Sequence, residues 1–217
     1  MKLDKDSYGS VALAWLIGAA LTALTFWLFR CPWVRWPLFA LFLTLVLWQT
    51  AFFRVPRRNR SGGPRSVLSV ADGKVVIAEK VFEPEFLNRE CLQLSVYMDF
   101  FDVHANFWPV DGEVVHYQYY PGEHFLAFKP KASEENEHSC VCLRTPFGQE
   151  VLFKQLAGGF ARRIVCYAEE GLVVRAGEQC GIIKFGSRID MYLPLDARIC
   201  VRVGDRVRAC ETVIAEL

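Results

Sequence analysis

The dipeptide Gly186-Ser187, close to the C-terminus, has the residue types needed to cut its own backbone. A serine hydroxyl held against the carbonyl of the preceding glycine can attack it and convert the amide into an ester. Glycine has no Cβ and therefore lets the hydroxyl approach. Elimination would release the upstream chain, and hydrolysis of the resulting dehydroalanine would leave a pyruvoyl group. Gly-Ser is also an ordinary turn dipeptide, so the surrounding sequence has to decide between the two interpretations.

The composition sets the first limits on the rest of the chain. The 217 residues suggest one domain or two small ones, and a net charge of +1 gives no argument for nucleic acid as a partner. The eight cysteines show no Cys-x-x-Cys spacing, so we expect free thiols in a reducing compartment and no metal site.

Residues 1–53 hold most of the excess hydrophobicity. Ser10–Phe29 and Trp36–Phe53 contain no charged residue, and the first would span about 30 Å as a helix. We predict a transmembrane hairpin of two helices, about 10–29 and 36–53. A re-entrant pair is the alternative because the connector is short, and a cleaved signal peptide is disfavoured because a second apolar stretch follows.

Residues 54–65 form a basic stretch that we expect to be a linker. It carries Arg54, Arg57, Arg58, Arg60 and Arg65 and no acidic residue. The positive-inside rule places this flank in the cytoplasm, and such a stretch also attracts anionic lipid headgroups. We therefore expect the following domain to face the cytoplasm from the cell (inner) membrane.

Residues 66–217 have the pattern of a mainly β domain with few helices. Short β-branched runs follow Asp-Gly turns at Asp72-Gly73 and Asp111-Gly112, whereas the polar stretch 131–138 looks like an exposed loop. Gly171–Glu178 resembles Gly204–Glu211, which begins 33 residues later (171 to 204). This repeat is typical of barrel-sandwich domains. Lys184 lacks the Met-Lys-Met-like context of a biotinyl or lipoyl carrier, so a carrier function is disfavoured.

In this order, the motifs resemble those of phosphatidylserine decarboxylases of the short bacterial type. The resemblance covers nearly the whole chain. It is carried by Ala71-Asp72-Gly73, by Met98–Asn106 with Pro109–Gly112, by Gln155–Ile164 and by Phe185–Asp190.

The resemblance implies an enzyme that matures by cleavage between Gly186 and Ser187. Ser187 would become a covalent pyruvoyl cofactor, which draws off electrons as CO₂ leaves. His104 would be the base and Asp72 would orient or charge it. Without the resemblance, His104 is a structural histidine and Asp72 a turn former. Phe107 occupies the position where long-form members carry a second histidine, so the base is the main open question.

The implied substrate is phosphatidylserine in an anionic membrane surface, and the product is phosphatidylethanolamine. Fragments 1–186 and 187–217 would form a heterodimer, and a homo-oligomer is possible. The alternatives are a non-enzymatic, membrane-anchored barrel-sandwich adaptor and a decarboxylase of a related serine-headgroup lipid.

Overall fold

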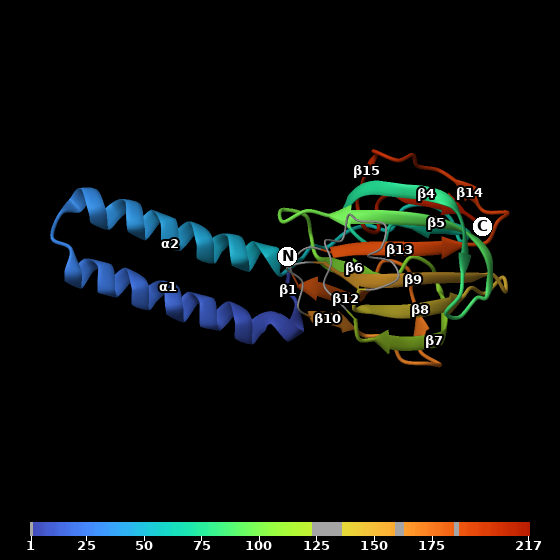
Figure 1. Ribbon diagram of the computed structural model, residues 1–217, viewed down its shortest axis with the longest axis horizontal. Helices are drawn as coiled ribbons and strands as arrows, with labels where there is room; N and C mark the ends of the chain where they lie inside the picture. The colour runs from blue at the N-terminus through green and yellow to red at the C-terminus, as the bar shows by residue number, and fades with distance from the viewer. Residues whose placement is uncertain (1, 123–135, 159–162, 185–186) are drawn as a thin grey trace. The chain divides into compact units, whose positions relative to one another are not determined.

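The protein is known from a computed structural model, which describes residues 2–122, 136–158, 163–184 and 187–217 (Figure 1). Of the two residues at the predicted cut, Ser187 therefore belongs to the described part and Gly186 does not. The chain divides into two compact units, residues 1–57 and residues 58–217. The division falls inside the stretch expected to be a linker.

The first unit is a helical hairpin closed by a short β-pair. Its elements are β1 (Lys2–Leu3), η1 (Lys5–Ser7), α1 (Tyr8–Leu28), α2 (Pro32–Phe52) and β2 (Arg54–Val55), and β1 pairs with β2. The second helix begins earlier than expected because Pro32 suits the first turn of a helix. Nη2 of Arg35, in α2, donates a hydrogen bond to the Phe26 carbonyl at 2.9 Å. This carbonyl lies in the last turn of α1, where helix carbonyls lack a partner within the helix.

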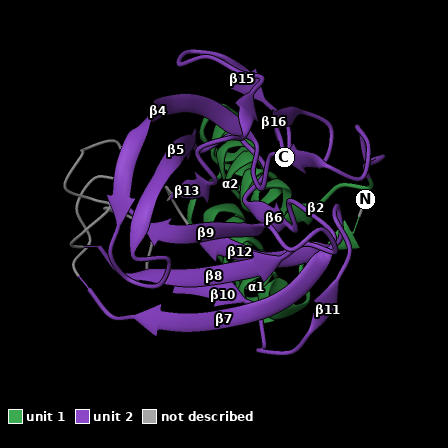
Figure 2. Ribbon diagram, turned by 90° about the vertical axis from the view of Figure 1, so that its right-hand side faces the viewer, with its two compact units in different colours: residues 1–57 green, residues 58–217 purple. Residues whose placement is uncertain are grey.

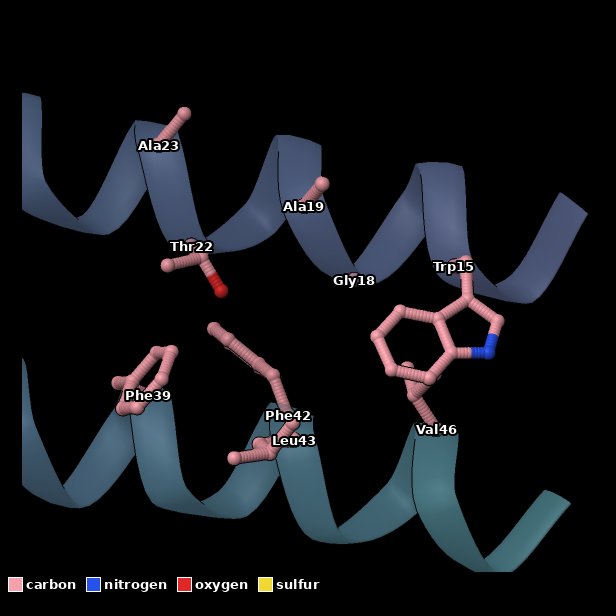
Figure 3. Close-up of a pocket in the computed structure, with 9 residues that line it drawn as sticks. All are labelled: Trp15, Gly18, Ala19, Thr22, Ala23, Phe39, Phe42, Leu43 and Val46. Carbon is pink, nitrogen blue, oxygen red and sulfur yellow. The ribbon is translucent and has the colours of Figure 1, made fainter. Parts of the chain in front are cut away.

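Both helices are long and apolar enough to cross a membrane, and membrane insertion remains a prediction. They approach closely at Gly18, where an added Cβ would lie 2.6 Å from Cγ2 of Val46. Figure 3 shows the apolar groove between them, where Trp15 and Val46 lie at one end and Phe39 at the other. Small residues at a helix contact allow this close packing.

The second unit is mainly β, as the sequence predicted. Its large sheet has the order β11-β7-β8-β9-β13-β5-β4-β15 within the described residues. The bounds are β4 Gly73–Glu83, β5 Arg89–Met98, β7 Gly112–Tyr120, β8 His138–Arg144, β9 Glu150–Ala157, β11 Val173–Val174, β13 Ser187–Leu193 and β15 Arg206–Val207. Figure 2 shows this sheet curling into part of a barrel.

Two smaller sheets complete the unit, with the orders β10-β12-β6 and β14-β16-β3 in the described part of the chain. Their strands are β3 Ser66–Leu68, β6 Ala105–Phe107, β10 Arg163–Cys166, β12 Gln179–Lys184, β14 Arg198–Ile199 and β16 Val213–Glu216.

The main hydrophobic core lies on one face of the large sheet. Strand β13 shows the alternation, because Ile189, Met191 and Leu193 belong to this core. The opposite face is also buried, with a smaller cluster that includes Cys140 and Cys142. All eight cysteines are free thiols, as predicted, and burial raises the pKa of Cys142 to about 12.

The internal repeat is visible as two equivalent contacts. The Asp72 carboxylate accepts a hydrogen bond from the Ala209 N–H and pairs with Arg58. The Asp111 carboxylate accepts one from the Ala176 N–H and pairs with Arg60. Each Asp-Gly turn thus binds one copy of the C-terminal repeat and one arginine of the basic stretch. These two arginines belong to the second unit, which begins at Arg58 within the expected linker.

Candidate active site

Ser187 is the first residue of β13, which lies in the middle of the large sheet (Figure 1). Its backbone is opposite Met98 of β5 on one side and Ala157 of β9 on the other. Phe185 and Gly186 lie outside the described residues. The bond predicted to be cut therefore ends at the first residue of a strand that is paired on both sides.

His104 is brought to this region by main-chain pairing. The Ile183 N–H of β12 donates to the His104 carbonyl at 3.2 Å, and β6, which follows His104, pairs with β12. His104 thus lies beside the strand that leads into Gly186-Ser187. The sequence predicted both residues for one site, and the backbone register brings their chain segments together.

A hydrogen bond to the main chain bears on the tautomer of His104. Its Nδ1 lies 3.0 Å from the Asp102 carbonyl oxygen, and His104 is completely buried. A carbonyl oxygen can only accept, so Nδ1 carries a proton, and in the neutral ring Nε2 has the lone pair of a base.

Asp72 makes different contacts from those expected of a residue that orients His104. Its described hydrogen bonds come from Arg58 and from the Ala209 N–H, and it is the Asp102 carbonyl that holds Nδ1 of His104. The negative charge of Asp72 acts on the carboxyl group of Asp102 in this region. Burial raises the pKa of the Asp102 carboxyl, and the negative charges of Asp99 and Asp72 raise it further.

A buried polar chain that the sequence did not reveal braces the strand after His104. The Ser139 hydroxyl donates to Oε1 of Gln155 at 2.8 Å, and Nε2 of Gln155 donates to Oδ1 of Asn106 at 2.8 Å. All three residues are fully buried. Gly181 allows the close packing, because an added Cβ would lie 2.9 Å from Nε2 of Gln155. Such a satisfied network fixes a unique arrangement of strands.

A second unpredicted pair follows Ser187 directly. Nε and Nη2 of Arg188 donate to the two carboxylate oxygens of Asp190 at 2.7 and 2.8 Å, and both side chains are fully buried. Opposite charges two residues apart on a strand share a face, which is the signal that could have indicated this pair. A bidentate, buried ion pair holds the start of β13 in one conformation.

Phe107 lies buried in β6, where its N–H donates to the Val70 carbonyl at 2.9 Å. A phenyl ring cannot accept a proton, so the position that holds a second histidine in the long-form pattern supplies no base here. No group of three or more potential metal ligands occurs among the described residues.

Comparisons with known proteins agree with the sequence motifs. The profile of the family described as phosphatidylserine decarboxylase matches residues 45–215. The phosphatidylserine decarboxylase proenzyme of Phocaeicola vulgatus is 39% identical, with 100% of this chain and 96% of the relative covered. That of Nitrosomonas europaea is 41% identical over 99% of this chain and 94% of the relative. That of Ralstonia pickettii is 46% identical over 84% of this chain and 82% of the relative. The chain therefore belongs to the phosphatidylserine decarboxylase family, and it is a decarboxylase.

Proposed function

We propose that the chain cuts itself between Gly186 and Ser187, and that the product decarboxylates phosphatidylserine to phosphatidylethanolamine at a membrane. One observation carries the proposal: main-chain pairing places His104 beside the strand that leads into Gly186-Ser187. The substrate comes from the names of the relatives, which are phosphatidylserine decarboxylase proenzymes. Membership of a decarboxylase family removes the support for a non-enzymatic adaptor.

In this proposal His104 activates the Ser187 hydroxyl. Nε2 of His104 takes the hydroxyl proton while the Asp102 carbonyl keeps Nδ1 protonated and the ring oriented. Asp72 adds negative charge near Asp102, which favours a positively charged imidazolium once the proton is transferred. The Asn106–Gln155–Ser139 chain holds β6 in place during the step.

Ser187 also suits a pyruvoyl group, because β13 is paired on both sides and would hold a new N-terminus at a fixed position. Such a group supplies an electrophilic carbonyl and a sink for the electrons released with CO₂. After the cut, fragment 187–217 would remain bound to fragment 1–186 through β13, through β15 on β4 and through β16 on β3. A non-covalent heterodimer follows from these pairings.

The proposed location is the inner membrane, with residues 58–217 on the cytoplasmic side. The two apolar helices would anchor the chain, and Arg54 and Arg57 are the flanking positive charges that favour a cytoplasmic position. This arrangement keeps the enzyme beside a substrate whose acyl chains stay in the bilayer.

The test is the intact mass of the purified, folded chain under denaturing conditions, together with CO₂ release from phosphatidylserine. We expect fragments 1–186 and 187–217, the second blocked at its N-terminus. Ser187→Ala should leave one inactive chain of full length. The matched control is Ser10→Ala, since Gly9-Ser10 is the same dipeptide within α1, and it should be cut normally. An uncut wild-type chain that still releases CO₂ would contradict the proposal, as would an uncut chain without activity.

A further inference from the structure

The turn between β5 and β6 presents two adjacent aromatic rings to solvent. Phe100 is 40% exposed and Phe101 is 77% exposed, whereas their neighbours Met98 and His104 are fully buried. We refer to Asp99–Asp102 as the Phe100–Phe101 turn. Single exposed aromatic residues are common on soluble proteins, but two together at a functional site suggest an interaction surface.

Hydrogen bonds hold this turn in one conformation. Oδ1 of Asp99 accepts from the Phe101 N–H at 2.9 Å and from the Asp102 N–H at 3.2 Å. Oδ2 of Asp102 accepts from the Asp99 N–H at 3.0 Å. Arg206 donates to both carboxylates, at 2.9 Å each. These bonds fix the backbone that carries Phe100 and Phe101, although the exposure of their rings to water is unfavourable.

The turn stands at the end of the sheet where the predicted cut lies. Met98 precedes it and is opposite Ser187, and His104 follows it by two residues. The turn between β8 and β9 lies at the other end of the sheet, because Glu150 begins the strand whose last residue, Ala157, is opposite Ser187. That far turn carries Phe147, which is 50% exposed.

The charges beside the Phe100–Phe101 turn are compatible with an anionic surface. The two carboxylates of the turn are both bonded to Arg206. Lys74 is exposed and is paired in register with Arg206 on one side and with Tyr97 on the other, so a second cation lies at this end of the sheet. Arg206 and Lys74 offset the charges of Asp99 and Asp102, so the turn carries no net negative charge that would keep its rings from an apolar layer covered by anionic headgroups.

We propose that the Phe100–Phe101 turn inserts into the interfacial layer of an anionic phospholipid bilayer and brings the end of the sheet that carries Ser187 to the depth of the lipid headgroups. The inference rests on the proposed function, since only a lipid substrate requires the site to meet the bilayer surface. It adds a second point of membrane contact, on the catalytic domain itself, to the anchor of residues 1–53.

The experiment uses the full chain in vesicles of equal parts phosphatidylcholine and phosphatidylglycerol, with a photoreactive residue at one position. In Phe101→benzoylphenylalanine, irradiation should give a phospholipid adduct on the peptide that contains residue 101, detected by mass spectrometry. Phe147→benzoylphenylalanine is the matched control, because Phe147 is similarly exposed in the turn at the far end of the sheet, and it should give none. A missing adduct at position 101, or equal adducts at both positions, would overturn the inference.

A kinetic measurement tests the same contact without the photoreactive group. Phe101→Ser should raise the apparent KM for phosphatidylserine in vesicles on the order of tenfold, while self-cleavage still goes to completion. Phe101→Leu, which keeps an apolar side chain, should restore most of the loss. An unchanged KM in Phe101→Ser would count against insertion. The adduct does not depend on activity, so an uncut, inactive chain would refute the proposed function alone, and a cut, active chain without an adduct would refute this inference alone.

Discussion

At the scale of single residues, one carbonyl contact determines what His104 can do. Because the Asp102 carbonyl accepts a hydrogen bond from Nδ1–H, the lone pair of the neutral ring is on Nε2, where it can take a proton. Phe107 has no such capacity, although its position in the motif is the one where a second histidine would be expected. Among the residues that the sequence nominated, His104 therefore stays the proposed base.

The corresponding prediction concerns the rate of self-cleavage. His104→Gln keeps a polar side chain of similar size but cannot take the Ser187 proton, so cleavage should slow by about 10²–10⁴-fold. The measurement is the fraction of fragment 187–217 against time after synthesis of the chain, by intact mass. His116→Gln is the control. His116 lies on β7, away from the cut, and its ring stacks on that of Phe86 with 4.2 Å between the ring centroids. Normal cleavage in a folded His104→Gln chain would remove His104 from this role.

At the scale of elements, the two Asp-Gly turns make equivalent arginine–aspartate pairs that differ in how deeply they are buried. The Arg58–Asp72 pair is nearly buried, with side chains 9% and 13% exposed, and its hydrogen bond raises the pKa of the guanidinium. In the equivalent Arg60–Asp111 pair the side chains are 32% and 35% exposed. Removing one partner of a buried pair leaves an uncompensated charge, whereas an exposed pair contributes little.

We therefore predict unequal effects from equal substitutions. Arg58→Met should lower the free energy of unfolding by about 3–5 kcal/mol, and Arg60→Met by about 0–1 kcal/mol. Thermal unfolding of the detergent-solubilised chain measures both. Because Asp72 lies near the site, Arg58→Met should also slow self-cleavage, and Arg58→Lys should recover part of the rate. Equal shifts in the two methionine variants would show that depth of burial does not distinguish the pairs.

The sequence was sufficient for the apolar helices, the mainly β domain and the repeat, because each depends on a local pattern. It was insufficient for contacts between distant segments. Nothing local distinguishes Arg58, which binds Asp72, from an arginine that serves topology alone. The predicted exposed loop 131–138 is wrong for residues 136–138, which are buried. There, Nδ2 of Asn136 donates to the Ala157 carbonyl at 2.6 Å, a contact between separate parts of the fold.

At the scale of the whole molecule, the large sheet is buried on both faces, but with different chemistry. One face packs the hydrophobic core, and the other holds an ionic cluster on β4, β8 and β9. Nζ of Lys154 lies 2.8 Å from Glu83 and 2.9 Å from Glu85, and Nε2 of His138 lies 3.1 Å from Glu85. The Glu83 carboxylate also accepts hydrogen bonds from the N–H groups of Phe86 and Leu87, so it fixes the turn that follows β4.

This cluster makes stability depend on pH at both extremes. Burial alone would raise the pKa of Glu83 and Glu85, but hydrogen bonds outweigh it and lower both. They come from Lys154 and two backbone N–H groups at Glu83, and from His138 and Lys154 at Glu85. A lowered carboxyl pKa gives stability above about pH 4.3 that is lost as the pH falls. Burial would lower the pKa of Lys154, but its bonds to the two glutamates raise it, so its contribution is lost only as the pH rises above about 10.4.

Lys154→Met should therefore test whether the ionic cluster stabilises the face of the large sheet opposite the hydrophobic core. At neutral pH it should lower the free energy of unfolding by about 3–5 kcal/mol, because Glu83 stays buried without its cation. The difference from wild type should shrink as the pH falls, because without Lys154 the buried Glu83 and Glu85 of the folded variant take up protons at a higher pH than those of the folded wild type. Denaturant unfolding at a series of pH values measures this. Lys80→Met, on the exposed side of β4, should change stability by less than about 0.5 kcal/mol. A Lys154→Met deficit that stays constant with pH would mean that packing of the lysine stem, and not its charge, stabilises this face.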